Sequence, residues 1–159
     1  MKNHPFDKLD YEIIKRLNNN SRLSASEIAR ELDANERTIR KRIERLVESG
    51  AVRMTTVVDP KVFGYWISVD IFLEMDLQQE EAILRTLMNL PHISYLAYGQ
   101  GTNTISIEAR FRDIAEMQEF LHQQLEGIPG VKVSGYALVP LILRNIDAWL
   151  PQAEDFPGE

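Results

Sequence analysis

The 159-residue sequence contains no cysteine, which excludes disulfide bonds, thiolate metal sites and a cysteine nucleophile. Its three histidines, His4, His92 and His122, are scattered, and this argues against a zinc site. No apolar run approaches the roughly 18 residues that a membrane-spanning helix needs, and the first residues lack the apolar stretch of a signal peptide. We therefore expect a cytoplasmic protein that has no membrane association, metal or other cofactor.

Basic residues are concentrated in the first part of the chain. The net charge of the whole sequence is −6, yet residues 1–60 carry 12 Lys and Arg against 10 Asp and Glu, a net charge of +2. Residues 61–159 carry the remaining 6 and 14, a net charge of −8. This asymmetry indicates two modules with different partners, of which only the first tolerates a polyanion.

Three short helices are predicted in the basic part of the chain. Asp7 is positioned to cap the first helix, and Ser24 and Glu27 have the spacing of a capping box that opens the second. After a three-residue turn, Asn35 can cap a third helix, and Gly50 stands where helices often end in a left-handed conformation. A helix, a tight turn and a second helix form a helix-turn-helix, whose second helix enters the major groove of double-stranded DNA.

The third predicted helix has an apolar face and a basic face. Its apolar face consists of Ile39, Ile43, Leu46 and Val47. We expect contacts with base edges from Arg37, Thr38 and Lys41, and contacts with phosphates mainly from Arg40, Arg42 and Arg45. Asn35, at the start of the helix, completes the predicted DNA-binding set.

An alternative interpretation is a solvated helix stabilised by ion pairs four residues apart, such as Arg40 with Glu44. Lys41 and Arg45 have the same spacing and like charges, which mildly destabilises an isolated helix. This pairing favours a role in DNA binding over a purely structural one.

The rest of the chain predicts a second, α+β module. Residues 52–65 are rich in β-branched residues and then interrupted by proline and glycine, which indicates a strand and a linker after the first module, residues 1–51. Residues 66–147 alternate as β-α-β-β-α-β, the order of a ferredoxin-like fold with both helices on one sheet face. Met88 and Ile114 are expected on the core sides of these helices. The acidic, proline-containing residues 148–159 predict a mobile tail.

The second face of the predicted sheet has no helix to cover it. The aromatic residues of the strands, some of which we expect on this face, are Trp66, Phe72, Tyr95, Tyr98 and Tyr136. An uncovered apolar sheet is an aggregation risk unless another copy covers it, so we expect a homodimer. The alternative is a monomer whose outer face is polar. A two-fold dimer would present two recognition helices to half-sites about one helical turn, or a multiple of it, apart.

The order and spacing of four motifs resemble the Lrp/AsnC (feast/famine) family of bacterial and archaeal transcription regulators, over residues 7 to about 150. The motifs are "LDYEIIKRL", "RTIRKRIERLVESGAV", "DPKVFGY" and "LEGIPGV". The resemblance implies an N-terminal (winged) helix-turn-helix domain and a C-terminal ferredoxin-like domain for ligand sensing and dimerisation. It also implies a homodimer that assembles further into tetramers or octamers, and a small-molecule effector, usually an amino acid.

The resemblance further implies a place for the effector. In similar proteins the effector lies between dimers, close to a G-x-x-D turn that joins the second and third strands of this domain. The residues implied here are Tyr98, Gly99, Gly101, Thr102, Asn103 and Thr104. Thr104 replaces the usual acid and supplies only a hydroxyl, where aspartate could pair with an ammonium group. An alignment shift of one or two residues would put Asn103 there instead, and the segment could also be only a hairpin turn.

An enzymatic function is a weaker alternative. Some tetrapyrrole decarboxylases resemble this family in architecture, which leads one to expect a histidine-containing second strand and an aromatic-rich third strand. Only His92 stands near that place, and the sequence offers no nucleophile–base pair or phosphate-binding loop. We therefore predict a non-enzymatic, sequence-specific transcription regulator modulated by a small molecule. A ligand-independent architectural DNA-binding protein is a further alternative.

Overall fold

The computed structural model describes residues 5–99 and 104–157, and the chain divides into two compact units. The first unit joins Met1–Val57 with Leu143–Glu159, and the second comprises Val58–Ile142. The first contains the helix-turn-helix and the second a four-stranded antiparallel sheet with helices, which confirms the predicted α+β class. The C-terminal residues, expected to form a separate tail, belong to the first unit.

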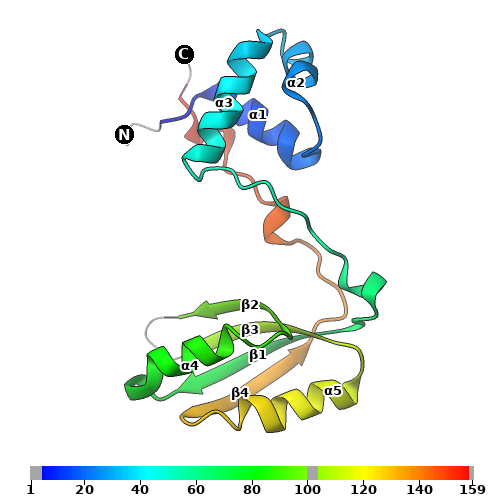
Figure 1. The fold of residues 1–159 in the computed structure, drawn as a ribbon, viewed down its shortest axis with the longest axis vertical. Helices are drawn as coiled ribbons and strands as arrows, with labels where there is room; N and C mark the ends of the chain where they lie inside the picture. Colours follow the sequence, from blue (N-terminus) through cyan, green and yellow to red (C-terminus); the bar gives the residue numbers. More distant parts are fainter. Residues whose placement is uncertain (1–4, 100–103, 158–159) are drawn as a thin grey trace. The chain divides into compact units, whose positions relative to one another are not determined.

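Figure 1 shows the three helices of the first unit, and a capping residue stands at the start of each. These are α1 (Lys8–Asn19), α2 (Ala25–Glu31) and α3 (Glu36–Glu48). The side chain of Asp7 accepts hydrogen bonds from the backbone amides of the first turn of α1, and Ser24 and Glu27 form the predicted capping box. Asn35 caps α3, and Gly50 follows it with a φ of 75°. The helices enclose a small core of Ile13, Leu17, Ile28, Ala29, Ile39 and Leu46.

Residues 51–58 form no strand, so that part of the prediction was wrong. None of the described strands pairs with this run, and Val57 and Val58 remain 62% and 57% exposed. A β-branched sequence favours a strand only where a neighbouring strand satisfies its backbone groups. The following short helix, η1 (Pro60–Phe63), ends at Gly64, whose φ is 84°.

The C-terminal segment differs from the expected mobile tail. It contains two short 3-10 helices, η4 (Ile146–Ala148) and η5 (Ala153–Asp155). The next residue, Phe156, is only 3% exposed, and its ring centroid lies 5.1 Å from that of Tyr11 in α1. Burial of an aromatic ring favours an ordered segment, and the acidic composition of residues 148–159 gave no sign of this contact.

The second unit has the predicted β-α-β-β-α-β order. Its strands are β1 (Ile67–Met75), β2 (Ile93–Tyr98), β3 (Thr104–Phe111) and β4 (Val131–Leu138), arranged as β2-β3-β1-β4. Its helices are α4 (Glu80–Leu87), preceded by η2 (Leu77–Gln79), and α5 (Ile114–Glu119), which continues as the π-helical segment η3 (Phe120–Leu125). Both helices lie on one face of the sheet (Figure 1).

Strict alternation along β1 and β3 directs one face of the sheet into the core. The buried residues of these strands are Val69, Ile71, Leu73, Met75, Ile105, Ile107, Ala109 and Phe111. They pack against buried residues of the helices, such as Leu87 and Phe120. Met88 and Ile114 were wrongly predicted to face the core and are 68% and 43% exposed, because each stands at an end of its helix.

The opposite face of the sheet is largely polar. Of the five aromatic residues considered for it, Phe72 and Tyr95 pair with polar residues of β3 and lie there. The strand register pairs Tyr98 and Tyr136 with buried residues of β3 and β1, which places both on the helix side. The polar residues on the outer face are Ser68, Asp70, Glu74, Ser106, Glu108 and Arg110. The fifth, Trp66, is 65% exposed and stands just before β1, outside the paired residues. Among the paired residues of the strands, the expected apolar face is therefore reduced to two aromatic rings in a polar setting.

Candidate nucleic-acid interface and effector site

The exposed side of α3 presents free polar side chains. Arg37, Thr38 and Lys41 are all exposed. Within the part of the chain that the structure describes, no ion pair or hydrogen bond engages the side chain of Arg37 or Lys41. We call these three residues the exposed ridge of α3. A helix side with unpaired cations can contact anionic or hydrogen-bonding groups without first breaking internal bonds.

Asn35 and Arg40 have local partners. The Asn35 side-chain oxygen accepts a hydrogen bond of 2.9 Å from the backbone amide of Arg37, so this residue is engaged as the helix cap. Arg40 forms an ion pair of 2.5 Å with Glu36, one turn earlier, rather than with Glu44 as considered above. Both side chains of this pair are about half exposed or more, so solvent screens it and Arg40 remains accessible.

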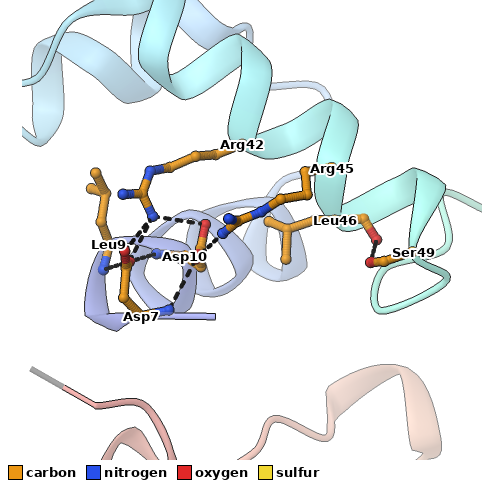
Figure 2. Close-up of polar contacts among 7 residues, drawn as sticks. All are labelled: Asp7, Leu9, Asp10, Arg42, Arg45, Leu46 and Ser49. Atoms are coloured by element: carbon orange, nitrogen blue, oxygen red, sulfur yellow. Dashed lines mark hydrogen bonds and ion pairs between the residues drawn. The ribbon is translucent and has the colours of Figure 1, made fainter. Parts of the chain in front are cut away.

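Arg42 and Arg45, expected to contact phosphates, have partners within the protein (Figure 2), and the side chain of Arg45 is still 50% exposed. One guanidinium nitrogen of Arg42 donates to both carboxylate oxygens of Asp7, each at 2.7 Å. The same nitrogen lies 3.0 Å from Oδ1 of Asp10, an ion-pair contact without hydrogen-bond alignment. Arg45 donates to Oδ2 of Asp10 at 2.5 Å. We call these four residues the Asp–Arg cluster.

Burial makes this cluster different from the surface ion pairs of the molecule. The side chain of Asp10 is fully buried, and those of Arg42 and Asp7 are 20% and 27% exposed. Burial alone would raise the pKa of the Asp7 carboxyl, but hydrogen bonds from Arg42 and from the backbone amides of Asp10 and Leu9 hold this pKa below its usual value. For Arg42, burial opposes the charged form, whereas its contacts with the two carboxylates raise its pKa above the usual value.

The sequence contained a signal for this cluster that a helix-by-helix reading misses. Asp10 lies three residues before Ile13 and seven before Leu17, so all three share the buried face of α1. A carboxylate on an apolar face needs a charged or hydrogen-bonding partner. The partners lie 35 residues later in the sequence, on α3.

The predicted effector residues are only partly described. Tyr98 ends β2, and its hydroxyl donates to the Glu80 carboxylate over 3.3 Å. Slight desolvation and this negative charge raise the pKa of Tyr98. Thr104 opens β3 opposite Glu74, and Gly99 follows β2. The remaining predicted residues, Gly101, Thr102 and Asn103, lie outside the described residues.

The described residues include neither a metal-binding cluster nor a membrane-spanning helix. Residues 5–99 and 104–157 include no cluster of three or more His, Asp or Glu side chains placed to hold a metal ion. In the same ranges, no helix combines the length and apolar character needed to cross a membrane.

Family models match both parts of the chain. A model described as winged helix-turn-helix DNA-binding matches residues 6–53. A model described as the Lrp/AsnC ligand binding domain matches residues 68–138. The two matches fall on the first unit, which carries the exposed ridge, and on the sheet of the second unit.

Relatives and solved structures agree with these matches over nearly the whole chain. The HTH-type transcriptional regulator Ptr1 of Methanocaldococcus jannaschii is 32% identical over 140 residues, covering 87% of this chain and 93% of the relative. The structure of Escherichia coli AsnC has a TM-score of 0.81 at 24% identity, covering 91% of this chain and 99% of that chain. The transcriptional regulator NMB0573 of Neisseria meningitidis, solved as a complex with L-Met, has a TM-score of 0.83 at 20% identity, with coverages of 91% and 96%.

Proposed function

Because this chain belongs to the Lrp/AsnC family of transcription regulators, we propose that it reads specific DNA through the exposed ridge of α3 under the control of an amino-acid effector. Membership in the family makes it a DNA-binding regulator with a ligand-binding domain and not an enzyme. The decarboxylase alternative is thereby set aside. The proposal concerns the residues that read the DNA, the effector and the assembly.

The free side chains of Arg37, Thr38 and Lys41 carry the proposal for DNA reading. They lie in the N-terminal half of the second helix of the helix-turn-helix, the part that meets base edges in the major groove. An arginine that binds a guanine bidentately contributes about 1–3 kcal/mol of discrimination. Arg40, exposed and only locally paired, is the phosphate contact that this arrangement supports best.

The effector proposal assigns an amino acid to the segment between β2 and β3, at Tyr98, Gly99, Gly101, Thr102, Asn103 and Thr104. The complex of the Neisseria protein with L-Met supports this class of ligand, because the two chains share a fold. Thr104 supplies a hydroxyl where an acid would bind an ammonium group, so we expect ligand recognition to depend on backbone groups and on hydroxyls. The effector must bind one assembly or DNA-binding geometry more tightly than another, since equal affinity shifts nothing.

We further propose a cytoplasmic homodimer that assembles into tetramers or octamers. Phe72 and Tyr95, 41% and 56% exposed on the outer sheet face, offer apolar contacts within a polar surface. A mixed surface of this kind is typical of an interface between subunits. A two-fold pair would present two α3 helices to two half-sites.

The test is a binding titration with the DNA duplex upstream of the protein's own gene and a scrambled duplex of equal length. It is done at two salt concentrations, with and without a pool of amino acids. We expect preferential binding to the upstream duplex, an affinity that falls steeply with salt, and a shift in affinity or assembly with the pool. Equal weak binding to both duplexes would indicate an architectural protein or a distant operator, and no binding to either would refute the function.

A further inference from the structure

We infer that Arg42 is a positioning residue of the DNA-binding unit, which fixes α3 on the start of α1 through Asp7 and Asp10 and does not bind phosphate. This inference rests on the proposed function, because it concerns how the exposed ridge is held in its reading orientation. It changes the role of a residue that the basic character of α3 assigns to DNA.

The position of Arg42 on α3 favours contacts within the protein. On the 3.6-residue period, Arg42 lies between the apolar face formed by Ile39 and Leu46 and the exposed ridge. Its side chain is 20% exposed, compared with 61% for Arg40 on the same helix. A guanidinium in this setting has exchanged water for protein ligands, and moving it to a phosphate requires breaking those contacts first.

The partners of Arg42 belong to the start of α1. Asp7 is the N-cap of α1, and its Oδ1 also accepts from the amides of Leu9 and Asp10 at 2.9 and 3.1 Å. Asp10 returns a bond to the backbone of Asp7, because its Oδ2 accepts from the Asp7 amide at 3.0 Å. Arg42 therefore binds to the first turn of α1 as a whole, and the charges of both carboxylates are directed at α3.

The buried carboxylate of Asp10 contacts both arginines of the Asp–Arg cluster. It contacts Arg42 through one oxygen and Arg45 through the other, as Figure 2 shows. The two arginines lie nearly one helical turn apart, so they hold α3 at two points along its length. A rotation or tilt of α3 against α1 would leave the buried charge of Asp10 without compensation, which is strongly unfavourable.

The consequence for DNA reading follows from the rigidity of a helix. Arg37 lies five residues before Arg42, and Lys41 lies directly before it, so their positions depend on how the same helix is oriented. Two contacts that fix α3 on α1 thereby fix the exposed ridge relative to the rest of the unit. Loss of the Asp–Arg cluster should weaken contacts with base edges more than contacts with phosphates, because contacts with base edges need directional hydrogen bonds.

The test removes one negative charge from the cluster and compares its effect with the same change elsewhere. Asp7→Asn keeps a good helix cap, because asparagine caps as well as aspartate, but it loses the ion pair with Arg42. Asp33→Asn is the matched control: Asp33 is exposed, its φ is 50°, and asparagine tolerates this conformation. Binding of the full-length protein to the upstream and scrambled duplexes is measured at several salt concentrations, and Tm is measured for each variant.

The positioning role predicts that only Asp7→Asn lowers the affinity for DNA. Removing an acidic residue ordinarily raises affinity for DNA, so Asp33→Asn should raise affinity slightly or leave it unchanged. Asp7→Asn should lower affinity for the upstream duplex about tenfold, the equivalent of one base contact, with little change for the scrambled duplex. Its Tm should fall by about 5 °C, and the slope of log affinity against log salt should not change.

The opposite result would overturn the inference. If Arg42 binds phosphate once its ion pair with Asp7 is lost, Asp7→Asn raises affinity for both duplexes. The slope of log affinity against log salt then becomes steeper. Arg42→Lys provides a second test, because lysine still binds phosphate but does not reproduce the contacts of the guanidinium. It should lose discrimination under the positioning role, and unchanged discrimination would contradict that role. Absence of binding by the unmodified protein would instead refute the proposed function itself.

Discussion

The two units of this protein obtain their stability from different sources. In the second unit, 14 apolar residues of the described chain are buried in one core shared by the sheet and both helices. The corresponding cluster of the first unit has only 6. The first unit contains in addition the Asp–Arg cluster around Asp10, the only charged residue that is buried among those described.

This difference matches the tasks of the two units. A unit that binds a polyanion needs a basic surface and has fewer apolar residues available for its core. Cations that bind carboxylates within the unit therefore help to hold its helices together. Small domains bury a smaller fraction of their surface and are marginally stable for that reason. We therefore expect the stability of the first unit to depend on charge and pH. The stability of the second unit should depend mainly on the volume of the side chains in its core.

Truncation of a buried ring should give the largest effect. Phe111 is fully buried, with its ring centroid 5.2 Å from those of Phe120 and His92. We expect Phe111→Ala to destabilise the second unit by about 3–5 kcal/mol, because it removes apolar burial and leaves a cavity. Peptide-resolved hydrogen exchange should show lost protection in β1 and β3. A loss centred on α1 to α3 instead would contradict the separate cores proposed here.

The same truncation in the first unit is the comparison. Phe156 is 3% exposed and packs on Tyr11. Phe156→Ala should cost about 2 kcal/mol, close to the transfer energy of the ring, because Phe156 follows a helix of only three residues, η5, and such a short element can adjust around a lost ring. An effect as large as that of Phe111→Ala would mean that the C-terminal segment is a central part of the first unit.

Acid should give the next largest effect, and in the first unit it should act through Asp7. The pKa of Asp7 is lowered in the folded protein from its ordinary value of 3.8. The contribution of this group to stability is therefore fully present above that value and is lost as the pH falls through the lower folded pKa. At neutral pH we expect Asp7→Asn to cost about 1–2 kcal/mol. Thermal unfolding at pH values between about 6 and 2 should show this difference shrinking in acid. A constant difference at all pH values would contradict the role of the ionised carboxylate.

Loss of the exposed pair on α3 should give the smallest effect on stability. Arg40 and Glu36 are 61% and 49% exposed, and pairs of this kind are worth about 0.3–0.5 kcal/mol. We expect Arg40→Gln to leave Tm nearly unchanged while reducing the salt dependence of DNA binding by about 0.9 in slope. A stability loss equal to that of Asp7→Asn would remove the distinction between the exposed arginines and those of the Asp–Arg cluster.

The sequence predicted what local chemistry determines. The caps at Asp7, Ser24 and Asn35 are formed by atoms within a few residues, and all three were confirmed. The order of strands and helices in the second unit was likewise predicted from alternation and helical spacing, and confirmed. The resemblance to the Lrp/AsnC family was confirmed by the family models and by a relative of 32% identity.

What the sequence did not predict depends on partners far along the chain. The contacts of Arg42 and Arg45 within the protein require carboxylates 35 residues earlier, and periodicity on α3 alone cannot reveal them. Residues 51–58 have the composition of a strand but no described strand beside them. The burial of Phe156 likewise depends on Tyr11, at the other end of the sequence.

The most direct test of the central claim, that the exposed ridge of α3 reads DNA, is a competition measurement on Arg37→Ala. Affinities for the upstream and scrambled duplexes are measured at one salt concentration for this variant and the unmodified protein. We expect the ratio of the two affinities to fall roughly tenfold or more, because a base contact is lost. Tm should stay unchanged, since the side chain of Arg37 forms no ion pair or hydrogen bond among the described residues. An equal loss on both duplexes would contradict the claim and make Arg37 a phosphate contact.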